Sequence, residues 1–409
     1  MKEMKQMVKA LHDNGIGVIL DVVYNHVFHT NAFCMNRIVP GYFSRQDAQG
    51  KLSNGSCCGN DTASERAMVR KYIVDSVCYW ADEYHIDGFR FDLVGLIDVQ
   101  TIQEIISTVH KKHPHVIFYG EGWSMNTQLT EKDLPLATQQ NAHLLPGFAF
   151  FSDQTRDVLK GSVFNSYDRG YVAGGLGLKA KVRDCFCARF DWTVDPTQVI
   201  SYVSCHDNMT LFDKIVASTY GASQSEQIAM NNLAAAIYML SQGVPFFQAG
   251  EEMLRSKPKS GGGFDSNSYQ SSDKVNALKW GNLDKPEYQN VLSYYRGLIA
   301  FRKTHNVLRL TSAEEVSRRV RMLPGTGANV LAFYLRGDQG KDLIVAFNPT
   351  HAQVSLPLPD GIWDICIWGE RAGNKVLAQA VHDVKIPPIS ATALVLNSVS
   401  TRKIASGTK

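Results

Sequence analysis

The chain has 409 residues, which at about 150 residues per domain allows two or three domains and a large core. Its 44% hydrophobic and 20% charged residues are those of an ordinary folded protein and argue against a disordered or fibrous chain. The formal charge is +3, with acidic and basic residues interleaved, so no nucleic-acid partner is expected. No apolar stretch reaches the ~20 residues of a membrane-spanning helix, so no membrane association is expected.

The amino-terminal residues and the cysteines bear on location. Residues 1–15 carry several charged side chains among the apolar ones and lack the pattern of a secretory signal. The eight cysteines show neither CxxC pairs nor histidines at ligand spacing, so no zinc site is expected. Reduced thiols are typical of a cytoplasmic protein, and this is the predicted location, although a full-length parent could be secreted. The sequence leaves the oligomeric state open.

Most of the chain repeats a helix followed by a strand. Apolar residues at helical spacing over 4–11 precede a β-branched run, 16–23, of the kind that forms a strand buried on both faces. A capping box from Thr62 to Glu65 is predicted to start a helix before the strand 88–92. Further predicted strands lie at 116–119, 148–152, 199–203 and 244–248, with helices at 99–109 and 227–240 between them. This alternation predicts an α/β fold with a parallel sheet.

After the predicted helix 288–303, the sequence pattern changes from alternating helices and strands to strands alone. The segments 330–335, 343–347 and 354–358 are separated by Gly, Pro and Asp turns and predict a small all-β domain. The glycine-rich stretch 260–263 lacks the lysine of a phosphate loop and predicts a flexible loop over a site.

Charged and polar groups follow four of the predicted strands. They are Asp21 to His26, Arg90 with Asp92, Glu121 with Trp123, and His206 with Asp207. The carboxyl ends of barrel strands share one face, so these groups are expected to meet in one pocket. Each motif has a plainer interpretation as a strand cap, a structural ion pair or a turn. All four motifs lie at equivalent places in successive helix–strand units, which argues against a purely structural role for all of them.

Two convergent carboxylates beside arginine, histidine and aromatic rings suit cleavage of a glycosidic bond, which needs one acid and one nucleophile. The carboxylate of Asp92 is expected to be kept ionised by Arg90. Glu121 is expected to have a raised pKa beside Trp123 and to stay protonated. The two acids would then differ in role.

The same residues resemble a known family. Four segments match, in order, the four conserved regions of the α-amylase superfamily: Asp21-Val-Val-Tyr-Asn-His26, Gly88-Phe-Arg-Phe-Asp-Leu-Val-Gly95, Tyr119-Gly-Glu-Gly-Trp123 and Tyr202-Val-Ser-Cys-His-Asp-Asn208. Their details, together with residues 54–65, resemble the type I pullulanases, which are α-1,6 debranching enzymes. The segment 267–276, followed by Trp280, is similar to the substrate loop after the eighth strand of those enzymes.

The resemblance implies a (β/α)8 TIM barrel followed by a small all-β sandwich domain. Because the chain starts at the helix before the third strand, it is expected to be amino-terminally truncated, with strands 3 to 8 and two unpaired sheet edges. The expected domains are a catalytic barrel domain at 1–305 and a C-terminal β-sandwich at 306–409.

The resemblance also implies roles for individual residues. Asp92 would be the nucleophile, Glu121 the general acid and later base, and Asp207 the third carboxylate, with retention of the anomeric configuration. The residues expected to bind substrate are Asp21, Tyr24, His26, Arg90, Leu93, Trp123, His206 and Asp273. No metal ligand is predicted and the chemistry requires no cofactor, although calcium binding, which many relatives show, stays open.

The expected activity is hydrolysis of α-1,6-glucosidic branch linkages in pullulan, glycogen or starch-derived dextrins, and the expected partner is an α-glucan. Two alternatives stay open. The chain could be an inactive truncated fragment with at most glucan binding, or an α-1,4-acting enzyme of the same superfamily.

Overall fold

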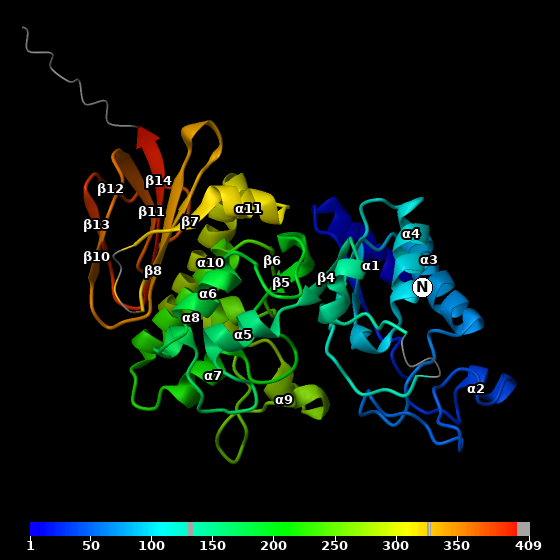
Figure 1. Cartoon of the computed structure of the whole chain (residues 1–409). Helices are drawn as coiled ribbons and strands as arrows, with labels where there is room; N and C mark the ends of the chain where they lie inside the picture. The colour runs from blue at the N-terminus through cyan, green and yellow to red at the C-terminus, as the bar shows by residue number, and fades with distance from the viewer. Residues whose placement is uncertain (130–133, 325–326, 328, 399–409) are drawn as a thin grey trace, which may run out of the picture. The chain divides into compact units, whose positions relative to one another are not determined.

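The computed structural model describes residues 1–129, 134–324, 327 and 329–398 (Figure 1). The chain forms two compact units. The first consists of Met1–Phe151 with Asp191–Ile200, and the second of Ser152–Phe190 with Ser201–Lys409. Among the described residues, no helix has both the length and the hydropathy that crossing a membrane would take.

Parallel strands in chain order build the sheet that the sequence predicts. The hydrogen-bonded order is β1-β2-β3-β4-β5-β6. The strands are β1 (Ile19–Val22), β2 (Gly88–Phe91), β3 (Ile117–Gly120), β4 (Phe148–Phe151), β5 (Val199–Ser201) and β6 (Val244–Pro245). All pairs from β1 to β5 are parallel, so the carboxyl ends of these strands lie along one edge of the sheet.

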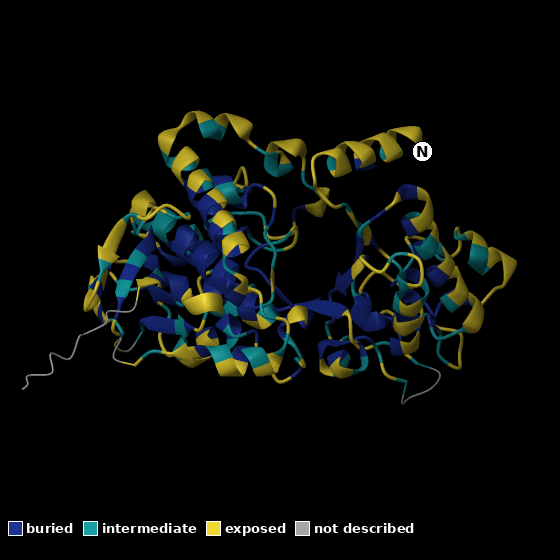
Figure 2. Ribbon diagram, turned by 90° about the horizontal axis from the view of Figure 1, so that it is seen from above, coloured by how far each residue is buried: buried dark blue, intermediate teal, exposed yellow. Residues whose placement is uncertain are grey.

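The first unit also contains α-helices. They are α1 (Lys2–Asp13), α2 (Cys34–Ile38), α3 (Ala67–Tyr84) and α4 (Val99–His110). On α3, Val69, Ile73 and Val77 lie at helical spacing and are buried. The helix marked N in Figure 2 is α1, which is mostly exposed and buries only Val8.

Two predictions for this unit are wrong. The first is that the strand after α1 is buried on both faces, since Ile19 is 41% exposed. β1 lies at an end of the hydrogen-bonded order, and among the described residues it has a neighbouring strand on one side only. The second is the capping box, because α3 begins at Ala67 with no side-chain cap. The Glu65 carboxylate is taken by the buried Arg45 guanidinium at 2.9 Å, and the Thr62 hydroxyl has no hydrogen-bond partner among the described residues.

The second unit holds the remaining helices. The helices are α5 (Asp153–Lys160), α6 (Lys179–Phe186), α7 (Leu211–Ser218), α8 (Gln224–Leu240), α9 (Asp273–Asn276), α10 (Pro286–Thr304) and α11 (Ala313–Arg319). The longest buried element is α8, which starts at a complete capping box of Ser223 and Glu226 and buries all of its residues from Met230 to Leu240. Its residues Met230 and Leu233 to Leu240 belong to one large hydrophobic cluster of this unit.

The carboxyl-terminal strands form two antiparallel sheets, in the orders β12-β11-β14-β9-β8-β7 and β10-β13. The strands are β7 (Val320–Met322), β8 (Leu331–Leu335), β9 (Leu343–Asn348), β10 (Val354–Pro357), β11 (Ile362–Trp368), β12 (Ala378–Ala380), β13 (Asp383–Ile386) and β14 (Ser390–Ser398). Ile344 of β9 packs with Leu356 and Val384 of the smaller sheet, so the two sheets enclose a core of their own, as in a sandwich.

The other face of β9 points to the helices. Val345 and Phe347 belong to the same buried cluster as Ile237 of α8 and Leu298 of α10. Side chains alternate between the two faces of a strand, so β9 contributes to both cores and all its residues are buried. The helices and the strands therefore form one compact unit. The two compact units do not divide the chain at residues 305 and 306. The boundary between a barrel domain and a β-sandwich domain at this place stays a prediction.

Candidate active site

The strand register of the first unit brings charged residues together. Asp21, Arg90 and Tyr119 are paired across β1, β2 and β3. Asp92 follows β2, and its N–H donates to Val22 O at 3.0 Å, while the Glu121 N–H donates to Phe91 O at 3.1 Å. Residues two apart on a strand share a face, so Arg90 and Asp92 point the same way.

Arg90 is the centre of this cluster. Its Nη1 lies 2.8 Å from Asp21 Oδ1 and 2.8 Å from Asp92 Oδ1, and its Nη2 lies 2.7 Å from Glu121 Oε1. Only 8% of the arginine side chain is exposed. Burial alone would lower the pKa of Arg90, but the surrounding carboxylates, led by Glu121, raise it above its ordinary value. The guanidinium thus keeps a fixed charge between carboxylates from three strands.

The contact between Arg90 and Glu121 adds to the sequence-based expectation, which paired the arginine with Asp92. The carboxyl ends of parallel strands are close enough for one guanidinium to reach both acids. The half-buried Trp123 follows Glu121 by two residues on the same loop. Arg90 therefore contacts both acids, and the expected difference in protonation between Asp92 and Glu121 stays a prediction.

Asn25 is a site residue that the sequence analysis did not assign. It is fully buried, and its Nδ2 donates to the backbone oxygen of Asp92 at 2.7 Å and to Asp92 Oδ2 at 2.9 Å. Its Oδ1 lies 2.6 Å from Nδ1 of His26. Asn25 therefore orients both the carboxylate and the histidine ring. The only signal was its place inside the Tyr-Asn-His motif.

A tight turn after β2 supports Glu121. Leu93 has a left-handed backbone with φ of 39°, and its N–H donates to Glu121 Oε2 at 3.1 Å. The Gly95 N–H donates to Glu121 O at 3.1 Å. The predicted substrate-binding residue Leu93 thus contacts Glu121 through its backbone, in a conformation that is unfavourable for a leucine.

Gly95 is required by the close approach of Trp123. A Cβ at this position would lie 2.0 Å from Trp123 O, which is backbone and cannot rotate away. We expect Gly95→Ala to destabilise the first unit by roughly 3 kcal/mol, the upper end of the usual cost of overpacking. Urea unfolding measures this. Gly281→Ala is the control, because a Cβ there meets nothing within 4 Å. An unchanged urea midpoint for Gly95→Ala would contradict the requirement for glycine beside the Trp123 backbone.

The segment before α3 is fixed by a buried carboxylate. Asp61 accepts hydrogen bonds from Ser53 Oγ at 2.6 Å, from Thr127 Oγ1 at 2.7 Å and from two backbone N–H groups. Burial would raise the pKa of Asp61, but these bonds together lower it. The neighbouring Asn60 bonds both backbone groups of Val27, at 2.9 and 2.6 Å. The network therefore holds the residue that follows His26.

Tyr24 lies beside this cluster. Its hydroxyl is 2.8 Å from Ser76 Oγ on α3, and its ring centroid is 6.1 Å from that of Phe91. Burial raises its pKa above the ordinary value. The hydroxyl thus faces the helix, and the predicted contact of Tyr24 with substrate stays a prediction.

The second unit presents His206 and Asp207 on an exposed turn after β5. Their side chains are 58% and 55% exposed, and His206 Nε2 lies 3.7 Å from Asp207 Oδ1. The next residue, Asn208, has a left-handed backbone with φ of 63°. Both side chains are therefore available to a ligand, while the turn itself needs support.

That support comes from two buried lysines that the sequence gave no reason to choose. Lys160 Nζ donates to Met209 O at 3.0 Å, and Lys257 Nζ donates to His206 O at 3.0 Å. Each lysine is only 2% exposed. Burial lowers the pKa of Lys160 to about 8. The backbone on each side of Asp207 is thus held by an ammonium group.

A buried glutamate lies under the same turn. Glu251 accepts hydrogen bonds from Ser204, from Tyr238 Oη at 2.8 Å and from Tyr295 Oη at 3.0 Å. Burial raises its pKa to about 7, although these bonds and Lys160 oppose the rise. Ser204 is two residues before His206, so this network reaches the start of the turn.

The remaining predicted features lie further along the second unit. Asp273 is exposed at the first position of α9. The stretch 260–263 is the tip of a hairpin closed by the Lys259 N–H on Gly263 O at 3.0 Å, and its position over a site stays a prediction. The described residues contain no group of three or more His, Cys, Asp or Glu side chains that could hold a metal ion.

Comparison with known proteins places this geometry in context. The family described as Alpha amylase, catalytic domain, matches residues 54–283. The pullulanase of Bacillus subtilis (strain 168) is 38% identical over 370 residues, which cover 88% of this chain and 50% of that protein. The solved pullulanase from Bacillus acidopullulyticus has a TM-score of 0.90 at 36% identity, with 96% of this chain and 48% of that one covered.

A further solved structure, a pullulanase from Paenibacillus barengoltzii in complex with maltohexaose and α-cyclodextrin, has a TM-score of 0.89 at 39% identity and covers 96% of this chain and 61% of that one. The chain thus spans about half the length of the curated relatives it matches. The predicted fold class, an α/β barrel-type sheet followed by a small β-sandwich, is confirmed by these similarities together with the observed strand order.

Proposed function

Since the chain belongs to the α-amylase family, we propose that it is a glycoside hydrolase that cleaves α-1,6-glucosidic branch linkages in α-glucans. The main support for the proposal is that Asp92 and Glu121, at the carboxyl ends of neighbouring strands, both form ion pairs with Arg90. The preference for α-1,6 bonds is supported by the pullulanases among the similar proteins. The relative bound to maltohexaose supports a substrate of linked glucose units.

In the proposed reaction, an oxygen of Asp92 attacks the anomeric carbon while Glu121 protonates the departing glycosidic oxygen. The bond between that carbon and oxygen breaks, and a glucosyl ester of Asp92 forms. Glu121, now ionised, then takes a proton from water, which attacks the same carbon and releases Asp92. Two inversions give net retention of the anomeric configuration.

The ion pair of Glu121 with Arg90 constrains this sequence of steps. A general acid must carry a proton, and a carboxylate bonded to a guanidinium favours the ionised form. We infer that Glu121 leaves Arg90 when a substrate binds, while Arg90 stays bonded to Asp92. The Leu93 N–H, 3.1 Å from Glu121 Oε2, remains to orient the acid.

The other residues are proposed to assist. Asp21 keeps Arg90 in place, and His26, oriented by Asn25, is proposed to bind sugar hydroxyl groups. Asp207 and His206, both exposed, are proposed to bind the sugar as charge develops on its ring. Trp123 is proposed to contact the acceptor side, and Asp273 the donor side.

The test is reducing-sugar release from pullulan by the 409-residue chain, with linear maltodextrin as the comparison and circular dichroism to check folding. Release from pullulan alone is expected. Release from maltodextrin alone would assign the chain to α-1,4 hydrolysis. A folded chain that releases sugar from neither glucan would overturn the proposal for this molecule.

Lys160→Met should lower kcat on pullulan by about tenfold, which corresponds to 1.4 kcal/mol, because Met209 O loses its donor and the Asp207 turn loosens. The KM is expected to change less, since Asp207 is proposed to act mainly in the transition state. The wild-type pH profile should fall as pH rises through about 8, where Lys160 loses its proton, and the variant should lack this limb.

Lys214→Met is the matched control for this variant. Lys214 is also 2% exposed and donates to loop carbonyl groups, but to Ser162 O and Asn165 O. Equal effects of the two substitutions on kcat and on the pH profile would show that Lys160 only stabilises the fold.

A further inference from the structure

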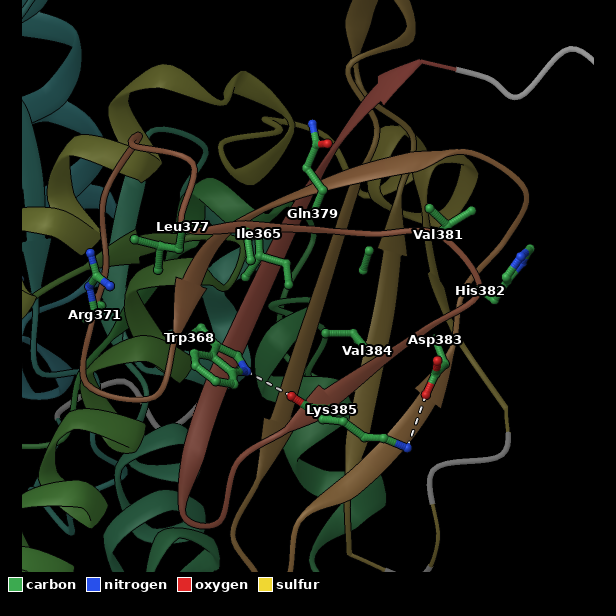
Figure 3. A pocket seen from close by; sticks show the side chains of 12 residues that line it. Ile365, Trp368, Arg371, Leu377, Gln379, Val381, His382, Asp383, Val384 and Lys385 are labelled. Carbon is green, nitrogen blue, oxygen red and sulfur yellow. Dashed lines mark hydrogen bonds and ion pairs between the residues drawn. The ribbon is translucent and has the colours of Figure 1, made fainter.

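The carboxyl-terminal β-sandwich contains an open groove of about 470 Å³ beside strands β11, β12 and β13 (Figure 3). This volume lies within the range of about 300–1,000 Å³ that is usual for small-ligand sites. Its lining includes Trp368, Arg371, Ala378, Gln379, Asp383 and Lys385. All of them belong to the second unit, whereas Asp92 and Glu121 belong to the first.

Trp368 provides a flat surface in this groove. The side chain follows the last core residue of β11 and is 43% exposed. Its indole Nε1 donates to Lys385 O at 2.8 Å on β13, as the dashed line in Figure 3 shows. The hydrogen bond fixes the plane of the ring and uses its only polar atom. What remains open to a ligand is the apolar face of the ring.

The charged groups of the groove are mostly paired. Lys385 Nζ lies 3.2 Å from Asp383 Oδ2, and that carboxylate also accepts from Ser355 Oγ at 2.7 Å. The Ser355 bond, followed by Lys385, lowers the pKa of Asp383, so the carboxylate stays ionised. Gln379 Nε2 donates to Asp364 Oδ1 at 2.8 Å. Asp383 and Lys385 compensate each other in charge, and Arg371 adds hydrogen-bond donors, a combination that suits a neutral polar ligand.

A sugar ring meets these conditions. A pyranose presents C–H groups on its face, which pack on an aromatic ring, and hydroxyl groups around its edge, which bond to polar side chains. The groove offers the ring of Trp368 with Arg371, Asp383 and Lys385 around it.

We propose that this groove is a second glucan-binding site, which holds a stretch of polymer on the Trp368 ring without taking part in catalysis. The identity of the ligand as an α-glucan rests on the proposed function. A site of this kind raises the affinity for a polymer, because the second contact is intramolecular once the first has formed, and leaves the affinity for short oligosaccharides unchanged.

The test is electrophoretic retardation in native gels containing soluble glycogen, compared with gels without polysaccharide. Trp368→Ala removes the ring, and Ala378→Arg fills the groove while leaving Trp368 and its hydrogen bond intact. Both are expected to weaken retardation by about fivefold to tenfold. Tyr220→Ala is the matched control, because Tyr220 is 98% exposed on the same unit but lies outside the groove.

Hydrolysis of a short branched oligosaccharide separates this proposal from the proposed function. All three variants should keep the wild-type kcat/KM on that substrate. Retardation of both groove variants equal to the wild type would overturn the glucan site and leave the proposed function untouched. Groove-dependent retardation with no release of sugar from any glucan would support the site and overturn the proposed function.

Discussion

Asp92→Asn is expected to lower the hydrolysis of pullulan by about 10⁴-fold or more, a loss of at least ~5 kcal/mol of transition-state stabilisation. The amide has the shape of the carboxylate but cannot form the ester intermediate. Arg90 keeps Asp21 and Glu121 as partners, so circular dichroism and the urea midpoint should change little. The rates are measured by reducing-sugar release.

Asp75→Asn is the control for this variant, because Asp75 is an exposed acid of the same unit, paired with Lys71 on α3. Glu121→Gln distinguishes the two roles. This substitution should strongly lower the rate of hydrolysis of pullulan. It should lower the rate much less on an aryl maltooligosaccharide, whose leaving group needs no proton. An active Asp92→Asn variant would exclude this residue as the nucleophile.

Arg90→Met should have the largest effect on stability. The substitution leaves the carboxylates of Asp21, Asp92 and Glu121 without their shared cation, and removing one partner of a buried ion pair costs about 3–5 kcal/mol. Urea unfolding should show this loss at pH 8, together with a fall in activity. Arg90→Lys should recover only part of it, because an ammonium group cannot reach three carboxylates in the same geometry.

The loss should depend on pH in a defined direction. Without the guanidinium, repulsion between the carboxylates favours their protonated forms in the folded state, which then binds more protons than the unfolded state. Stability of the variant should therefore rise as the pH falls from 8 to 5, relative to the wild type. Arg37→Met, at an exposed arginine of α2, is the control. A loss that is independent of pH would point to packing rather than charge.

The sequence was sufficient to predict the parallel sheet, because β3 and β4 are short, continuous apolar runs and the amphipathic helices α3 and α4 precede β2 and β3. It also predicted that Asp21, Arg90, Asp92 and Glu121 meet, because register and strand direction alone bring them together. The arginine contact to Glu121 was missed, since a side chain's choice between two nearby acids is a matter of tertiary geometry.

Other features depend on contacts that are distant in sequence. The pattern from Thr62 to Glu65 fits a capping box, but Arg45, 20 residues away from Glu65, takes its carboxylate. Lys160 and Lys257 come from segments with no motif, and each finds its carbonyl partner about 50 residues along the chain. Asn25 gains its role because its loop turns back toward Asp92.

The double-faced strand β9 has a consequence for how the second unit opens. Val345 and Phe347 pack with α8 and α10, while Ile344 packs inside the sandwich, so neither layer can separate without exposing apolar surface of the other. Local unfolding proceeds in contiguous cooperative groups. In native-state hydrogen exchange, the amides of α8 and β9 should therefore share one opening free energy. Proteolytic nicking between α10 and β7 should release the helices and the sheets together rather than liberate a folded sandwich.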